Sequence, residues 1–156
     1  MGCFPSKNAA IQNTGLDGLG MVLETKKGVT PAAQVFADKK AVMLYFAAHW
    51  CPSCRAFTPV LVKMYEEHMT ESVAVVFVSS DRTDQTFKES YEDMPWAALP
   101  FEDRARKDAL ATEYGVAGIP SLIVLDGSGK LLSREGRQEL LQSGSFQAAL
   151  ESWQDS

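Results

Sequence analysis

Two cysteines, Cys51 and Cys54, carry the clearest chemistry in this sequence of 156 residues. They follow an apolar run, enclose Pro52 and Ser53, and open a segment with helical spacing. The first turn of a helix leaves backbone N–H groups unpaired and carries the positive end of the helix dipole. A thiolate of Cys51 would be stabilised there, so we expect this thiol to ionise more readily than free cysteine.

The spacing of the pair predicts what the second sulfur does. Cys54 lies three residues after Cys51 and therefore on the same helix face, where the two sulfurs would be within disulfide-bonding distance. The thiolate of Cys51 can then attack a substrate disulfide and form a mixed disulfide. Cys54 resolves it by attacking Cys51, which closes an internal disulfide and releases the reduced substrate.

A Cys-x-x-Cys pair also occurs in structural zinc sites and in haem attachment. A structural zinc site needs four ligands, usually as two pairs. The remaining Cys3, His49 and His68 supply no second pair, so we expect no metal. Haem attachment requires histidine after the second cysteine, where Arg55 stands, so haem is excluded. A thiol–disulfide oxidoreductase of this kind is expected to carry no bound cofactor.

Composition limits the class of protein. A mass of 17.1 kDa, with 46% hydrophobic and 22% charged residues, predicts one globular domain. The net charge of −5 and the lack of a basic cluster argue against a nucleic-acid partner. No apolar run is long enough to span a membrane. Three cysteines are too few and too unevenly spaced for a secreted disulfide framework, so we expect a reducing, cytoplasmic compartment. We expect a flexible segment over 1–19 and a domain over 20–156.

Apolar runs predict the strands. Residues 41–48, 73–78 and 122–125 lack polar alternation, as strands buried on both faces do. The turn at 126–129 predicts a hairpin partner at 130–132. A further short strand is expected at 21–23.

Spacings of three and four predict the helices. They indicate helices over 52–69, 83–93 and 107–114, the second capped by Thr83 or Asp84. Another helix is expected to begin at Thr30 as N-cap with Pro31 in the first position. The last helix, capped by Ser145, would bury Phe146, Leu150 and Trp153. Strands alternating with helices predict an α/β fold with a central mixed β-sheet flanked by helices on both faces.

Pro120 opens a predicted strand and follows Gly118 and Ile119. A proline at this place is often a plain strand-start residue. It can also be cis, which costs an X-Pro bond only about 0.5–1 kcal/mol. A cis bond would turn the backbone of Ile119 outward, where it could pair with an extended substrate.

Several segments together resemble the nucleoredoxin and tryparedoxin group of thioredoxin-fold proteins. The resemblance runs across residues 40–137 and rests on residues 45–59, 76–82, 94–96, 114–120 and Gly136-Arg137. It implies the thioredoxin fold. It also implies Cys51 as nucleophile, Cys54 as resolving thiol, Pro120 as a cis-proline opposite the pair, and Trp50 as a shield on one side.

The resemblance further implies supporting positions. Asp81 and Arg137 match polar residues near the active site, and Arg55 matches the arginine after the second cysteine. Simpler interpretations remain open, since Asp81 could be a helix-start acid and both arginines solvated charges. Trp96 and Trp153 are expected to serve packing.

The sequence also departs from this group. Pro52-Ser53 stands in place of the usual Pro-Pro between the cysteines. Tyr45 stands where many thioredoxins carry a buried acid, so proton transfer to Cys54 needs another group or water. Arg82 replaces an acid and would repel a polyamine-bearing thiol, which favours the nucleoredoxin-like alternative.

The expected activity is thiol–disulfide exchange that reduces protein disulfides in the cytoplasm. Electrons would come from an external reductase or a low-molecular-weight thiol. Two alternatives stay open. The chain could be a redox-regulated binding or adaptor module, or a tryparedoxin-type electron donor to a peroxidase.

The amino terminus carries a lipidation motif. Gly2 after Met1, with Ser6 in the sixth position, matches N-myristoylation, and Cys3 beside it suits palmitoylation. Two acyl chains give stable anchoring, so the motif predicts attachment to the cytosolic face of a membrane. The alternative is that this short motif matches by chance.

Overall fold

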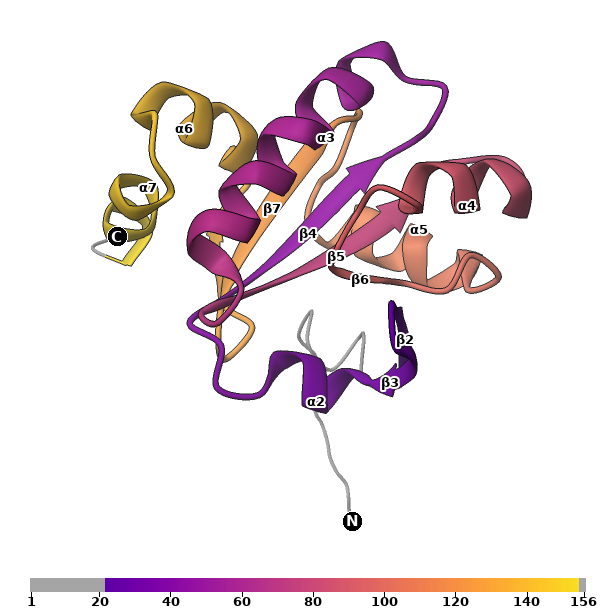
Figure 1. Cartoon of the computed structure of the whole chain (residues 1–156), viewed down its shortest axis with the longest axis horizontal. Coiled ribbons are helices and arrows are strands. Elements are labelled where there is room, and N and C mark those ends of the chain that lie inside the picture. The colour runs from indigo at the N-terminus through magenta and orange to yellow at the C-terminus, as the bar shows by residue number, and fades with distance from the viewer. Residues whose placement is uncertain (1–21, 155–156) are drawn as a thin grey trace.

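The computed structural model describes residues 22–154, which form a seven-stranded mixed sheet with helices against it (Figure 1). The strand order is β3-β2-β6-β5-β4-β7-β8. The strands are β2 (Val22–Thr25), β3 (Gly28–Pro31), β4 (Ala41–Ala47), β5 (Val73–Ser79), β6 (Ala97–Ala98), β7 (Ser121–Asp126) and β8 (Leu131–Ser133). The helices are α2 (Ala32–Phe36), α3 (Pro52–Met64), the π-helical turn η1 (Tyr65–Met69), α4 (Asp84–Tyr91), α5 (Arg104–Glu113), α6 (Gly136–Ser143) and α7 (Phe146–Gln154).

The three apolar runs form the centre of the sheet, as predicted. β4 pairs parallel with β5 and antiparallel with β7, and every residue of β4 and β5 is buried. The register places Ala47 opposite Ser79, and Phe46 opposite Ser121. The loops that follow β4 and β5, and the loop that precedes β7, therefore meet at one edge of the sheet.

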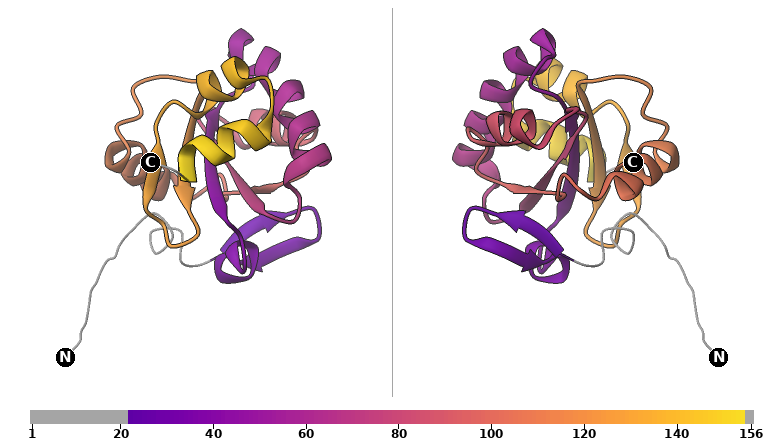
Figure 2. Two further views of the ribbon diagram at one scale, coloured as in Figure 1. Left: turned by 90° about the vertical axis from the view of Figure 1, so that its left-hand side faces the viewer. Right: turned by 90° about the vertical axis from the view of Figure 1, so that its right-hand side faces the viewer.

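The alternating side chains of the central strands build a core on each face. Met43, Tyr45 and Phe77 pack on one face beneath α3, α4, α6 and α7. Val42 and Leu44 pack on the other face with residues of α2 and α5. Figure 2 shows the sheet close to edge-on, with α5 on the side opposite α3 and α4. The predicted arrangement, a mixed sheet with helices on both faces, is confirmed.

The predicted helix caps agree in part with the structure. The Thr83 hydroxyl accepts the Thr86 N–H at 3.1 Å, and the Ser145 hydroxyl accepts the Ala148 N–H at 3.1 Å. Trp96 and Trp153 are buried as predicted. The helix predicted over 107–114 corresponds to α5, which begins three residues earlier, at Arg104.

Four expectations about the elements were wrong or incomplete. Thr30 is no N-cap, because it pairs with Leu23 in the β2–β3 hairpin, and Pro31 precedes α2. The strand β3 was therefore missed. The short strand β6 and the helix α6 were missed as well.

The predicted segment 1–19, with the predicted lipidation of Gly2 and Cys3, lies outside the described residues. Among residues 22–154, no helix is both long and apolar enough to cross a membrane.

Candidate active site

Cys51 is the N-cap of α3, and Pro52 takes the first helical position. The Cys51 Sγ accepts the backbone N–H of Cys54 at 3.2 Å. This N–H is one of the donors that a helix start leaves unpaired, so the sulfur itself caps the helix. Pro52 and Ser53 are exposed in the same turn. The predicted position of Cys51 at the helix start is confirmed.

Cys54 lies beneath Cys51 and is only 1% exposed. Burial, together with a hydrogen bond that the Cys54 thiol donates to the Cys51 sulfur, raises the pKa of Cys54 to about 12. A backbone hydrogen bond with Ala48 and the positive charge of Arg137 act in the opposite direction. Both thiols are free and in contact, so the pair is asymmetric, with Cys54 the more deeply buried partner.

Tyr45 contacts the backbone of Cys54 from the sheet below. Its hydroxyl forms a hydrogen bond of 2.7 Å with the Thr58 hydroxyl and donates to the Cys54 carbonyl at 3.4 Å. Burial raises the pKa of Tyr45, so the phenol stays neutral. The position under the dithiol therefore holds a neutral hydrogen-bonding group.

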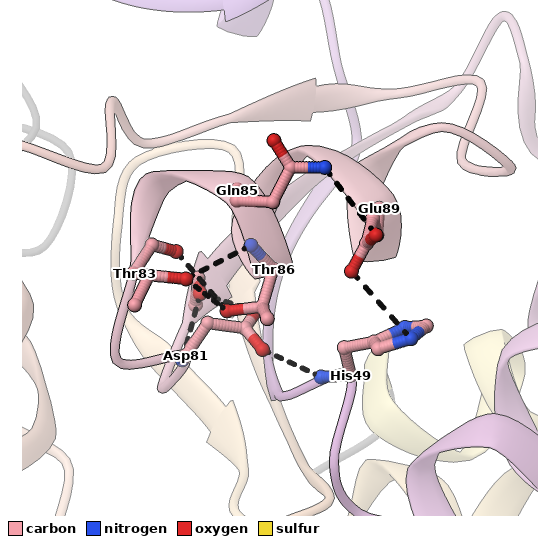
Figure 3. Close-up of polar contacts among 7 residues, drawn as sticks. His49, Asp81, Thr83, Gln85, Thr86 and Glu89 are labelled. Atoms are coloured by element: carbon pink, nitrogen blue, oxygen red, sulfur yellow. Dashed lines mark hydrogen bonds and ion pairs between the residues drawn. The ribbon is translucent and has the colours of Figure 1, made fainter.

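Asp81 ties the loop before Cys51 to the end of β5, and it is only 4% exposed. Its Oδ1 accepts the backbone N–H of His49 at 2.8 Å, and its Oδ2 accepts the Ser79 hydroxyl at 2.7 Å. Figure 3 shows this contact beside the start of α4. Asp81 precedes the N-cap Thr83, so the simpler interpretation as a helix-start acid was wrong.

His49 also reaches α4 with its side chain. Its Nε2 lies 3.9 Å from Oε1 of Glu89, and the two side chains are 41% and 47% exposed (Figure 3). Sequence reasoning set His49 aside and did not single out Glu89. No local pattern in the sequence joins two residues so far apart, because their contact depends on where α4 packs.

Trp50 is 52% exposed, directly before the nucleophile candidate Cys51. The guanidinium carbon of Arg82 lies 5.6 Å from the centre of the Trp50 ring. A cation at this distance is attracted by the face of the ring. The predicted shielding of the cysteine pair by Trp50 stays a prediction.

The Ile119–Pro120 peptide bond is cis. Ile119, Pro120 and Arg137 line a shared pocket of about 360 Å³. Arg137 belongs to α6, and its guanidinium carbon lies 5.7 Å from the Phe57 ring of α3. Its buried Nε has no hydrogen-bond partner within the described part of the chain. Arg137 therefore connects this pocket to the helix that carries the dithiol.

A larger pocket of about 670 Å³ lies between α3 and α4 and reaches Cys54. His49 and Glu89 lie on its wall, and the exposed Arg55 also lines it. Within residues 22–154, no group of three or more His, Cys, Asp or Glu side chains could hold a metal ion.

Comparison with known proteins identifies the class. A family model described as Thioredoxin-like matches residues 38–131, which is more than half of the chain. The chain therefore belongs to the thioredoxin-like family, and the predicted thioredoxin fold is confirmed.

Within that family, the chain is related to nucleoredoxin and tryparedoxin. It is 46% identical to nucleoredoxin of Mus musculus over 102 residues, which are 64% of this chain and 23% of that protein. It is 40% identical to tryparedoxin of Trypanosoma brucei brucei over 105 residues, which are 66% of this chain and 73% of that protein. A solved structure of tryparedoxin II complexed with glutathionylspermidine has a TM-score of 0.74 and 34% identity, covering 80% of this chain and 87% of that one. The chain thus spans about a quarter of the length of the nucleoredoxins that it matches.

Proposed function

We propose that this chain is a thiol–disulfide oxidoreductase that reduces protein disulfides through Cys51 and Cys54. The observation that carries the proposal is the asymmetry of the pair. The Cys51 sulfur caps α3 and accepts the Cys54 N–H at 3.2 Å, while Cys54 lies 1% exposed beneath it. The helix start stabilises negative charge on the first sulfur, and burial keeps the second one protonated.

The two sulfurs then act in sequence. The thiolate of Cys51 attacks one sulfur of the client disulfide, and the other client sulfur leaves with the electron pair of the broken bond and takes up a proton. Cys54 loses its proton and attacks Cys51, which breaks the mixed disulfide and closes the internal one. The client gains two electrons, and the dithiol is oxidised.

The client would bind beside the exposed Trp50 and the pocket lined by Ile119, Pro120 and Arg137. This assignment rests on the resemblance and on the place of Arg137 against α3. Arg55 and Asp81 support the site from the helix and from the end of β5.

The oxidised chain needs an electron donor, and we propose an external reductase or a low-molecular-weight thiol without a polyamine. A tryparedoxin II structure is complexed with glutathionylspermidine. In this chain, the guanidinium of Arg82 lies over the Trp50 ring, beside the dithiol. A polyammonium group would be repelled there.

Turnover of insulin disulfides with dithiothreitol tests the activity. Cys51→Ser should abolish turnover, since no other thiol caps the helix. Cys3→Ser is the matched control and should keep wild-type turnover. Full activity in Cys51→Ser would overturn the proposed nucleophile.

Trapping separates a reductase from a binding module. Cys54→Ser removes the resolving thiol, so reductase clients should accumulate as disulfide-linked complexes of Cys51. A single partner that is retained without a covalent bond would favour an adaptor instead.

We also propose attachment to the cytosolic face of a membrane through acylation of Gly2 and Cys3, on the strength of the sequence motif alone. Metabolic labelling with an alkyne myristate should mark the wild-type chain and not Gly2→Ala. Equal labelling of both would remove the proposal.

A further inference from the structure

The proton of Cys54 needs a route out of the protein, because this thiol must ionise before it can attack. Cys54 is only 1% exposed, and burial holds its pKa near 12. Two neighbouring groups, Tyr45 and Arg137, accept no proton readily. Tyr45 is neutral and hydrogen-bonded to Thr58, and Arg137 is a cation. The base therefore has to act from another side.

The pocket between α3 and α4 reaches Cys54 and opens to solvent. Its volume of about 670 Å³ is many times the ~30 Å³ that one water molecule occupies in the liquid. Water-mediated proton transfer between Cys54 and a group on the pocket wall is therefore sterically allowed.

The charged groups on the wall come from three helical segments. Arg55 and Lys63 of α3 are cations and accept no proton. Carboxylates come from η1 and from α4 with the turn after it, and they are Glu66, Glu67, Glu89 and Asp93. Carboxylic acids ordinarily titrate near pH ~4, far below a thiol, so they are poor proton acceptors at neutral pH.

His49 is the wall residue whose chemistry suits the task. Imidazole changes charge between about pH 5 and 8, which makes it an effective base near neutrality. The backbone N–H of His49 is fixed by Asp81 at 2.8 Å, and the preceding Ala48 hydrogen-bonds to the Cys54 thiol. The carboxylate of Glu89, 3.9 Å from Nε2, stabilises the imidazolium that forms (Figure 3).

We propose that His49, paired with Glu89, accepts the proton of Cys54 through water in the pocket between α3 and α4. The Cys54 thiolate then attacks the Cys51 sulfur, the bond from Cys51 to the client sulfur breaks, and the Cys51–Cys54 bond forms. The client sulfur leaves as a thiolate, and His49 returns its proton to that thiolate or to solvent. The inference rests on the proposed function. It adds His49 as the residue that accepts the proton and Glu89 as the residue that stabilises the charged His49.

Stopped-flow reaction of the reduced Cys3→Ser protein with the chromogenic disulfide DTNB separates the two steps, because Cys51 and Cys54 are then the two thiols of the chain. This protein serves as the wild type here, and the further substitutions are made in it. Attack by Cys51 releases the first aryl thiolate at a rate that depends on DTNB concentration. Attack by Cys54 releases the second one at a rate that does not. His49→Asn should slow only the second phase, by roughly 100-fold at neutral pH.

The pH profile distinguishes proton transfer from a structural effect. In the wild type, the second phase should become faster as the pH rises and His49 becomes able to accept a proton, and His49→Asn should lose this dependence on pH. Added imidazole should restore part of the rate in His49→Asn. Glu89→Gln, a change at a half-exposed side chain, should slow the second phase by a smaller factor.

His68→Asn is the matched control. His68 also pairs with a glutamate at 3.9 Å, but it is absent from the pocket wall, so both phases should match the wild type. An unchanged second phase in His49→Asn would overturn this inference and leave the proposed function intact. A first phase that persists in Cys51→Ser would overturn the proposed function itself.

Discussion

The carboxylate of Asp81 accepts the backbone N–H of His49 at 2.8 Å and so joins the end of β5 to the loop that leads into the dithiol. Its second oxygen accepts the Ser79 hydroxyl, which in turn accepts the Asp81 N–H at 2.9 Å. Both carboxylate oxygens are thus engaged, and the loop before Cys51 is fixed from outside the helix that it precedes.

Loss of this carboxylate should destabilise the fold. Asp81→Ala leaves the part-buried N–H of His49 and the buried hydroxyl of Ser79 without their acceptor, which should lower the free energy of unfolding by about 2–3 kcal/mol. Urea unfolding measures this change. Asp108→Ala is the control, because Asp108 is 75% exposed in its ion pair with Lys107, and it should change stability by less than about 0.5 kcal/mol. Equal effects of the two variants would contradict a structural role of Asp81.

Stability should fall at alkaline pH because of Cys54. Its pKa in the folded chain is raised to about 12 from an ordinary value of 9.0, so between these values the unfolded chain loses a proton that the folded chain keeps. The stabilisation from this thiol is complete below about pH 9 and is lost as the pH rises toward 12. Urea unfolding of the wild type and of Cys54→Ala across this range isolates the contribution, since other alkaline groups are common to both. If the difference in free energy of unfolding between the two proteins stayed constant from pH 9 to 12, the proposed contribution of Cys54 would be contradicted.

The close packing of α6 on β7 can be tested by a substitution at Gly136. A Cβ at Gly136 would lie 2.8 Å from the Leu122 carbonyl oxygen and 2.8 Å from Cγ2 of Val124. Gly136→Ala must therefore push α6 away from the sheet, and we expect a loss of about 1–3 kcal/mol in the free energy of unfolding. Gly118→Ala is the control, because nothing lies within 4 Å of a Cβ there. Thermal unfolding of both variants tests this. A loss in Gly136→Ala alone supports close packing at Gly136, and an equal loss in Gly118→Ala would contradict it.

The parts of the fold that the sequence predicted are those in which local pattern and tertiary environment agree. The continuous apolar run at 41–48 is buried on both faces, and the side chains of Thr83 and Ser145 cap helices through contacts within three residues. Thr30-Pro31 was misread because the same residue types suit a helix start and an edge strand. The pairing with β2, which decided the outcome, is not a local property.

The missed elements depend even more on distant partners. β6 has two residues and exists because it lies between β5 and β2. α6 begins with glycine and buries only Gly136 and Leu140, so its periodic signal is weak. The dithiol was predictable because helix start and cysteine spacing are local. The contact of His49 with Glu89 was not, since it depends on where α4 packs.

Arg82 should set the charge preference of the dithiol. Its guanidinium lies 5.6 Å from the ring of Trp50, the residue before Cys51, so an approaching disulfide meets a positive charge. For each protein, we compare the rate of reaction with anionic glutathione disulfide to the rate with cationic cystamine. The ratio of these two rates should be higher for the reduced wild type than for reduced Arg82→Glu. We expect this ratio of rates to fall several-fold in Arg82→Glu, and added salt to narrow the difference. Lys130→Glu makes the same change in net charge at the β7–β8 turn, at the opposite end of the sheet from Cys51, and should leave the ratio unchanged. If the two variants shift the ratio equally, the net charge of the chain sets the preference, and the local contact of Arg82 with Trp50 does not.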